Sequence, residues 1–236
     1  GVTAENLAEK YQISRQQSDE YALMSQQRCE AARNTNRFTD EIVAVEIADK
    51  KGNKTLIATD EHPRANTTLE GLAKLRPVFK ENGNVHAGNA SGITDGAAAI
   101  LVVSEEKIAD LKVKPVARIV DYTVAGVDPT IMGIGPVPAV RKLLQRNQLS
   151  LPDIDLIELN EAFAVQVLAC QRELHFDLDK VNVNGGAIAL GHPIGCTGTR
   201  IVVTLLHEMA KRDVNLGLAT LCVSGGMGMT LLLERA

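Results

Sequence analysis

The sequence predicts an α/β protein with a layered fold built on a mixed sheet. Two observations lead to this prediction. From about residue 112 to the end, short apolar runs of strand length alternate with longer segments of helical periodicity. Near the C-terminus, the apolar runs 216–223 and 229–234 follow each other closely, which is typical of adjacent strands. The resulting order, β-α-β-α-β-α-β-β, favours a layered unit whose sheet contains both parallel and antiparallel strands.

Each element of this unit follows from its own pattern. Short apolar runs indicate buried strands, and apolar residues that recur every three to four positions indicate helices. The expected strands are 116–124, 154–159, 181–183, 216–223 and 229–234, and the expected helices are 138–147, 161–174 and 197–212.

The chain before residue 112 is more polar and less regular. Ser14 and Gln17 have the spacing of a capping box, which predicts a helix from there to residue 33. The charged segment 49–80 is expected to run over the surface. The other expected elements are a helix-like opening segment, a strand over 41–48, a short helix opened by the Thr67-x-x-Glu70 spacing and ended by Pro77, a strand over 97–103 and a helix over 104–110.

Composition excludes several classes of partner. The 236 residues carry a formal charge of −4 and no basic stripe, so we expect no nucleic acid partner. No signal peptide and no apolar span of about 20 residues is visible, so we expect no membrane partner. The four cysteines form no Cys-x-x-Cys pair, which favours a reducing cytoplasm, and the histidines lack ligand spacing, so no metal is expected.

Two glycine-rich turns each contain one chemically reactive residue. His192 lies between a glycine and a proline in the run 181–195, and Cys222 opens the run 222–228. Glycines let backbone N–H groups approach a ligand closely, and loop placement favours chemistry over packing. Taken alone, either residue is better read as an ordinary loop histidine or a buried cysteine. Their joint occurrence favours a site.

The residue types suggest acid and base chemistry beside a carbonyl group. Cys222 suits an acid or base, because a thiol titrates close to neutrality and neighbouring N–H groups favour the thiolate. His192 suits a donor to a carbonyl oxygen. Asn160 is expected where a strand ends, at the sheet edge where ligands of α/β proteins commonly bind. An N-cap of the following helix is an equally good interpretation of Asn160.

Several motifs, in order, resemble the thiolase family, in particular its acetyl-CoA C-acetyltransferases. The resemblance rests on Asn-Glu-Ala-Phe-Ala at 160–164, the two glycine-rich runs, and further segments at 12–15, 21–22, 86–96 and 132–136. It implies a thiolase-like layered fold of two units. Residues 1–111 would be the loop region and tail of the N-terminal unit, and residues 112–236 the complete C-terminal domain. The chain resembles the last three-fifths of a thiolase, and the family's nucleophilic cysteine lies in the preceding portion.

The same resemblance implies an activity and its partners. We expect an acyltransferase of fatty acid metabolism that condenses two acetyl-CoA reversibly to acetoacetyl-CoA and coenzyme A, with this chain alone inactive. The alternatives are a longer-chain 3-ketoacyl-CoA thiolase and a non-catalytic module that binds coenzyme A thioesters. Coenzyme A is then a substrate or product, no cofactor is bound permanently, and the partners are the missing N-terminal portion and further copies in a homo-oligomer.

The family's roles map onto numbered residues of this chain. Cys222 would be the acid/base, and His192 would help to activate the nucleophile. His192 and a water held by Asn160 would form one oxyanion hole. A second hole would use a backbone N–H at Ser224, where the family has glycine. The implied coenzyme A contacts are Arg64 at the adenine or phosphates, Ala87, Ala90 and Ser91 along the pantetheine arm, and Met132 and Phe163 at the acyl pocket.

Two positions depart from the family or invite a different interpretation. Gly71 stands where relatives commonly carry a serine near the coenzyme, which removes one polar contact. Cys196 lies four residues after His192 at an expected helix start, where a thiol pKa would be depressed. We interpret Cys196 as a small buried side chain, and Cys29 and Cys170 as helix residues with no activating neighbour.

Overall fold

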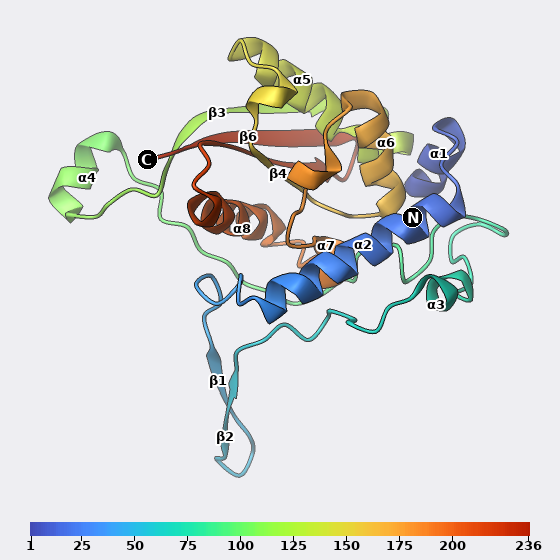
Figure 1. The fold of residues 1–236 in the computed structure, drawn as a ribbon, viewed down its shortest axis with the longest axis horizontal. Coiled ribbons are helices and arrows are strands. Elements are labelled where there is room, and N and C mark those ends of the chain that lie inside the picture. The colour runs from blue at the N-terminus through green and yellow to red at the C-terminus, as the bar shows by residue number, and fades with distance from the viewer.

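A four-stranded mixed sheet with strand order β3-β6-β5-β4 forms the centre of the computed structural model, which describes residues 1–236 (Figure 1). β3 (Ala117–Gly126) and β5 (Leu216–Val223) both pair antiparallel with β6 (Met227–Arg235), whereas β4 (Leu156–Leu159) runs parallel to β5. The mixed sheet predicted from the sequence is therefore confirmed.

Helices cover both faces of this sheet. α5 (Pro136–Arg146) and α6 (Ala164–Leu174) pack on one face, and α8 (Thr197–Arg212) packs on the other (Figure 1). Side chains alternate along β5, so Leu218 belongs to the apolar cluster of α5 and α6, while Ala219 belongs to that of α8. This alternation decides which residues of each strand reach which side of the site.

The remaining elements surround this core, and a hairpin and a short helix extend from it. The hairpin of β1 and β2 and the short helix α4 project away from the body of the molecule (Figure 1). No helix is long and apolar enough to span a bilayer. The further elements are α1 (Val2–Lys10), α2 (Arg15–Asn34), β1 (Val45–Ala48), β2 (Lys54–Ile57), α3 (Leu69–Ala73), α4 (Glu105–Leu111), η1 (Pro129–Ile134), η2 (Leu151–Asp153), η3 (Leu178–Lys180) and α7 (Ala187–Leu190).

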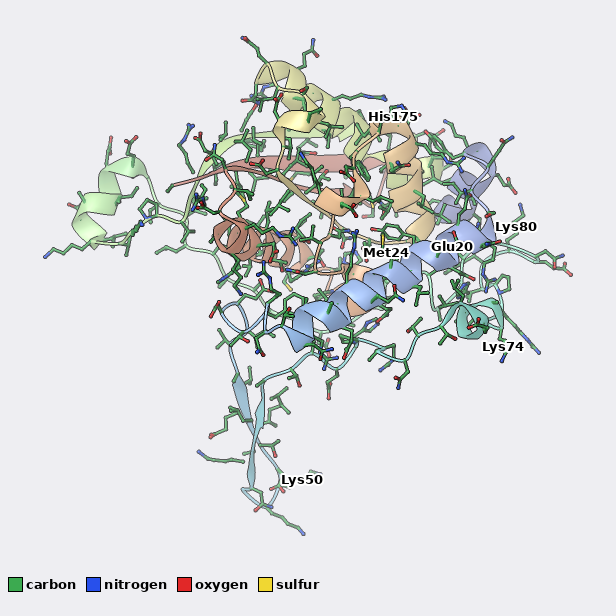
Figure 2. The ribbon with its side chains drawn as sticks, viewed as in Figure 1. Glu20, Met24, Lys50, Lys74, Lys80 and His175 are labelled. Atoms are coloured by element: carbon green, nitrogen blue, oxygen red, sulfur yellow. The ribbon has the colours of Figure 1, made fainter.

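The capping box expected before α2 is present. The Ser14 hydroxyl accepts from the Gln17 N–H, and the Gln17 side chain accepts from the Ser14 N–H. One side of α2 carries buried residues that pack on α6 and α7, and the other is polar. On that polar side, Glu20 points away from the body of the molecule (Figure 2).

The starts of α6 and α3 differ from the sequence predictions for identifiable reasons. α6 begins at Ala164 instead of residue 161, because Phe163 is extended and forms an antiparallel bridge with Ala90. α3 is capped by Thr68, whose hydroxyl accepts from the Gly71 N–H, and not by Thr67. At α6 a contact with a distant segment sets the start of the helix, and at α3 the neighbouring threonine takes the place of the expected cap.

Two predicted strands do not form. Residues 97–103 have no regular structure, and Leu101 and Val102 are 74% and 67% exposed, because no neighbouring strand offers backbone partners. Over 181–183 the chain makes only an isolated bridge between Val181 and Ile157. Both segments therefore have the apolar pattern of a strand, but neither joins a sheet.

Candidate functional site

The candidate residues gather at the edge of the sheet where the parallel strands β4 and β5 end. Asn160 directly follows β4, and its N–H donates to the Thr220 carbonyl at 3.0 Å, which continues the ladder between the strands. Cys222 lies two residues after Thr220, near the end of β5. The predicted placement of Asn160 at the carboxyl edge of the sheet is confirmed.

Asn160 and Cys222 approach this edge from opposite faces of the sheet. Leu156 packs in the cluster of α8, and the strand period places Asn160 on that same face. Leu218 packs in the cluster of α5 and α6, so the same period places Cys222 on the other face. A ligand that reaches both side chains must lie across the edge of the sheet.

His192 is held at this edge by its backbone and by its ring. The preceding Gly191 has φ +94°, a conformation that favours glycine, which turns the chain sharply at the end of α7. The His192 N–H donates to the Gly92 carbonyl at 2.8 Å, and Asn160 Nδ2 lies 3.4 Å from His192 Nε2. Asn160 therefore partners His192, and the N-cap interpretation is wrong, since Phe163 occupies that position of α6.

The second ring nitrogen of His192 contacts Thr197 at the start of α8. Nδ1 lies 2.6 Å from the Thr197 hydroxyl, which is also 3.0 Å from the Pro193 carbonyl. A hydroxyl donates one proton only. When it donates to Pro193, Nδ1 must carry the ring proton of neutral His192, and Nε2 is free to accept a proton. When it donates to Nδ1, Nε2 carries the proton and donates to an oxygen.

The surroundings of His192 favour the uncharged ring. Burial lowers its pKa below the usual 6.5, and the positive charge of Arg200 lowers the pKa further. Asn160 is 1% exposed, and its Oδ1 has no hydrogen-bond partner within the chain. This corner of the site therefore offers one neutral imidazole and one available amide oxygen.

Cys222 does not have the depressed pKa that its glycine neighbours suggest. Burial raises the pKa of its thiol to about 11. At neutral pH the side chain is a protonated thiol, so the expectation of a favoured thiolate is wrong. The glycine-rich turn lies beyond the strand, and desolvation of the partly buried sulfur exceeds the lowering effect of a backbone hydrogen bond on the thiol pKa.

The segment 86–92 is fastened to the residues after β4. Ala90 forms the bridge with Phe163, and Ser91 donates both its N–H and its hydroxyl to the Ala162 carbonyl, at 3.0 and 3.1 Å. Gly92 binds the His192 backbone as described above. Three of the expected pocket residues, Ala90, Ser91 and Phe163, thus lie beside the Asn160 and His192 pair.

Met132 lies in η1 and approaches the Cys222 side of the edge. η1 packs against β5 and β6. The turn that follows η1 comes so close to β6 that a Cβ on Gly228 would lie 2.0 Å from the Gly135 carbonyl oxygen. Gly228 pairs with Cys222 across the two strands. The close approach, which requires glycine, holds η1, the element that contains Met132, against the strand pair that carries Cys222.

Three expected residues lie further out. Ser224 is exposed in the turn between β5 and β6, and the left-handed conformations of that turn fall on Gly225 and Gly226 instead. Ala87 is exposed, and so is Arg64, whose guanidinium contacts only the Glu61 carbonyl. The chain does not bring Arg64 into contact with the other site residues.

Sequence reasoning missed residues that support the site. Glu161, 1% exposed, accepts from Tyr21, Ser25, Asn182 and the Ile188 N–H, and so joins α2 and α7 to the segment before α6. The sequence spacing around Glu161 does not indicate these hydrogen-bond partners. Thr197 was identifiable in principle, since a threonine at a helix start five residues after His192 reaches back toward the preceding turn.

The other three cysteines differ in burial, and a separate cavity lies away from this edge. Cys29 and Cys170 are fully buried, which raises the pKa of both thiols, that of Cys29 to about 12. Both predictions for these residues are confirmed. Cys196 is the N-cap of α8 and is partly exposed, so it is not the buried side chain we expected. A cavity of about 390 Å³ lies between the end of α2 and the base of the hairpin.

Comparisons with known proteins agree with this geometry. Family models match residues 1–106 (thiolase, N-terminal domain) and 113–235 (thiolase, C-terminal domain). An acetyl-CoA acetyltransferase of Pseudomonas aeruginosa is 56% identical over 235 residues, which cover 100% of this chain and 60% of that protein.

Two solved structures match the whole chain. The acetyl-CoA acetyltransferase of Bacillus anthracis has a TM-score of 0.97 at 51% identity, with 60% of that chain covered. Human mitochondrial 3-ketoacyl-CoA thiolase in complex with CoA has a TM-score of 0.95 at 50% identity, with 58% covered. The chain thus spans about three-fifths of the length of the relatives it matches. With matched models over both parts and this level of identity, the chain belongs to the thiolase family.

Proposed function

We propose that the complete protein containing this chain is an acetyl-CoA C-acetyltransferase. It condenses two acetyl-CoA reversibly to acetoacetyl-CoA and coenzyme A. The observation that carries the proposal is the edge of the sheet, where the Asn160 and His192 pair lies on one face and the protonated Cys222 on the other. The acetyl-CoA acetyltransferases among the relatives, at 51–56% identity, support this choice of reaction.

The nucleophilic thiol is proposed to lie in the two-fifths of the relatives that this chain does not match. In thiolysis, His192 Nε2 takes the proton of that thiol, which then attacks the ketone carbonyl of acetoacetyl-CoA. The protonated Nε2, with a water held by the free Asn160 Oδ1, donates to the thioester oxygen, which becomes negative when the enolate of acetyl-CoA forms. The Ser224 backbone N–H is proposed as a donor of a second such hole.

Cys222 is proposed to be the acid in the same direction. When the carbon–carbon bond breaks, the electron pair goes to the departing acetyl-CoA enolate, and the Cys222 thiol protonates its α carbon. The resulting thiolate takes the proton of an incoming coenzyme A thiol, which attacks the acylated nucleophile and releases a second acetyl-CoA. A buried thiol with a raised pKa suits this role, because it is protonated at rest and strongly basic once ionised.

Coenzyme A thioesters are the proposed ligands, as substrate and product, with no permanently bound cofactor. Ala87, Ala90 and Ser91 are proposed to line the pantetheine arm, with Arg64 at the adenine or phosphate end. The fastening of segment 86–92 to the residues after β4 supports this path. The solved complex of a human relative with CoA supports the ligand class.

A longer-chain 3-ketoacyl-CoA thiolase is the second candidate. Human mitochondrial 3-ketoacyl-CoA thiolase matches this chain at 50% identity, close to the acetyltransferase of Bacillus anthracis at 51%. Met132 and Phe163, both partly buried, are proposed to bound the acyl group. A ratio of kcat/KM that favours long over four-carbon ketoacyl substrates would select this candidate.

We also propose a homo-oligomer, in which the parts of the family fold absent from this chain take part, and a location in a reducing cytoplasm. Four free cysteines, without a disulfide among them, support the reducing compartment.

Thiolysis of acetoacetyl-CoA tests the proposed function. We would measure the loss of the ketoacyl thioester with this chain alone and with the missing portion supplied from a relative. No turnover alone and turnover on complementation is expected, with loss of turnover in His192→Asn. Turnover by this chain alone that disappears in Cys196→Ala would place the nucleophile here and contradict the proposal. Binding of coenzyme A without turnover in both mixtures would favour the non-catalytic module.

A further inference from the structure

A second polar pair lies behind the Asn160 and His192 pair. Glu158 is 3% exposed and sits two residues before Asn160, so both side chains leave β4 toward α8. Its partner is Arg200 of α8, whose Nη1 lies 3.7 Å from Glu158 Oε2. The interior of this layer therefore contains a guanidinium and a carboxyl group that the proposed reaction does not use.

The two pairs run in parallel along the same layer. Residues two apart on a strand are separated by about 7 Å, which sets the distance from Asn160 to Glu158 along β4. On the helix side, Thr197 holds the His192 ring, and Arg200 lies three residues later, on the same face of α8. The Arg200 guanidinium is thus displaced from the His192 imidazole by about the length of two residues along β4.

The Glu158 and Arg200 pair is poorly bonded for a buried ion pair. Glu158 Oε2 and Arg200 Nε have no hydrogen-bond partner, and Arg200 Nη1 makes only a long contact of 3.5 Å with the Thr204 hydroxyl. Removing charges from water is costly, and such a pair contributes to stability only when its bonds are well formed. Stability of the fold therefore does not explain this arginine.

Burial weakens the acids that could compensate the charge of Arg200. Three carboxyl groups face it: Glu158 on β4, Glu41 after α2 and Asp60 after β2. Burial raises the pKa of Glu158 to about 8 and of Glu41 to about 7, and raises that of Asp60. Near neutral pH, Glu158 and Glu41 are therefore partly protonated, whereas the guanidinium stays charged.

We propose that Arg200, held against Glu158, is a positioning residue that keeps the His192 ring uncharged. The guanidinium charge lies behind the ring and opposes protonation of the imidazole, which is otherwise contacted only by the uncharged groups of Asn160 and Thr197. His192 Nε2 is then free to accept a proton at neutral pH. The use of that free nitrogen in catalysis rests on the proposed function, but the electrostatic effect on the ring does not.

Titration of His192 by NMR tests this proposal in the 236-residue chain. The ring signals of carbon-13 histidine are followed between pH 4.5 and 9, and the His192 signal is identified by its loss in His192→Gln. Arg200→Gln removes the charge, and we expect the pKa of His192 to rise by about half a unit or more, a threefold or larger gain in proton affinity. Arg200→Lys keeps the charge and should leave the pKa at the wild-type value.

Arg37→Gln is the matched control. Arg37 pairs with Glu208, a buried acid of the same helix α8, but it does not stand behind His192. Its loss should leave the titration of His192 unchanged. Arg200→Met serves as a second neutral variant if Arg200→Gln fails to show the wild-type circular dichroism spectrum.

Two results would overturn the proposal: a folded neutral variant at position 200 in which His192 titrates as in the wild type, or an equal shift in Arg37→Gln. The titration needs neither substrate nor turnover. A chain that shows the expected shift but fails the thiolysis assay after complementation would refute the proposed function alone.

Discussion

Thr197 decides which nitrogen of His192 can react. Its hydroxyl contacts both His192 Nδ1 and the Pro193 carbonyl, and when it donates to Pro193 it accepts from Nδ1, which leaves Nε2 unprotonated. In the proposed reaction Nε2 then takes the proton of a thiol, while Nδ1 keeps its own proton and its bond to Thr197. The protonated Nε2 donates to an oxyanion without any change at Thr197.

Removal of this hydroxyl should impair turnover more than binding. Thr197→Val keeps the shape of the side chain, and we expect kcat for thiolysis in the complemented protein to fall about tenfold, equivalent to one lost hydrogen bond, with KM nearly unchanged. Thr199→Val, two residues along the same helix, is the matched control. Equal kcat values for the two variants would refute the role of Thr197.

The raised pKa of Cys222 predicts its reactivity. Alkylation by iodoacetamide requires the thiolate, so modification of Cys222 should be slow at pH 7 and increase up to about pH 11. Mass spectrometry of the digested chain measures this rate for each cysteine separately. Cys29 and Cys170 serve as internal controls that stay unmodified while the fold is intact. Rapid modification of Cys222 at pH 7 would show that its thiolate is favoured after all.

The candidate residues were largely identifiable from the sequence, but their ionisation and support were not. His192, Asn160 and Ser91 lie in glycine-rich or strand-end segments, and the structure places all three together. The state of Cys222 depends on which face of β5 carries its sulfur, and that follows from packing with α5 and α6. Burial of this kind has no local sequence pattern.

At the scale of elements, one buried carboxylate, that of Glu161, joins two helices. Its donors are Tyr21 and Ser25 of α2, Asn182 after η3, and the Ile188 N–H of α7, the helix that leads into His192. Through α7, the orientation of His192 depends on a residue that lies next to Asn160 in the sequence. Glu161 and its hydrogen bonds therefore set the positions of these helices at the site.

Neutralising this centre should destabilise the chain. Glu161→Gln replaces a charged acceptor by an amide, and we expect the free energy of unfolding in urea to fall by about 2 kcal/mol or more, because hydrogen bonds to a charged group are lost. Glu20→Gln on the exposed side of α2 is the control and should change it by less than about 0.5 kcal/mol (Figure 2). Similar values for both variants would mean that Glu161 does not hold the helices.

Helices and paired strands were predictable because their information is local. The capping box of α2 and the amphipathic runs of α8 and β5 carry their own start, end or buried face, and α8 and β5 have the expected bounds. Residues 97–103 have the composition of a strand. A strand also needs a neighbouring strand to pair with, and the local sequence does not show whether one is present. The start of α6 was set by the Ala90 bridge, a contact over 73 residues.

At the scale of the whole molecule, exposed apolar surface marks where further structure is expected. The segment 97–103 and one face of β3 present large apolar side chains, among them Leu101, Val102, Ile119 and Val124. Extended patches of this kind are uncommon on isolated domains. The chain covers about three-fifths of its relatives, and this surface is where we propose that the remaining part of the protein packs.

The isolated chain should therefore self-associate. Replacement of Leu101 and Val102 by serine should lower the average mass measured by light scattering after size-exclusion chromatography, because it removes part of the apolar surface. Val78→Ser, at a separate and similarly exposed position, is the control. Unchanged self-association in the Leu101 and Val102 variant would exclude this segment as its cause.

The central claim is that Cys222 exchanges a proton with the α carbon of a coenzyme A thioester. Deuterium uptake into the methyl group of acetyl-CoA in heavy water, followed by NMR with the complemented protein, tests it most directly. We expect catalysed uptake that is lost in Cys222→Ala and retained in Cys196→Ala. Uptake that persists at the wild-type rate in Cys222→Ala, or no uptake in the wild-type protein, would contradict it.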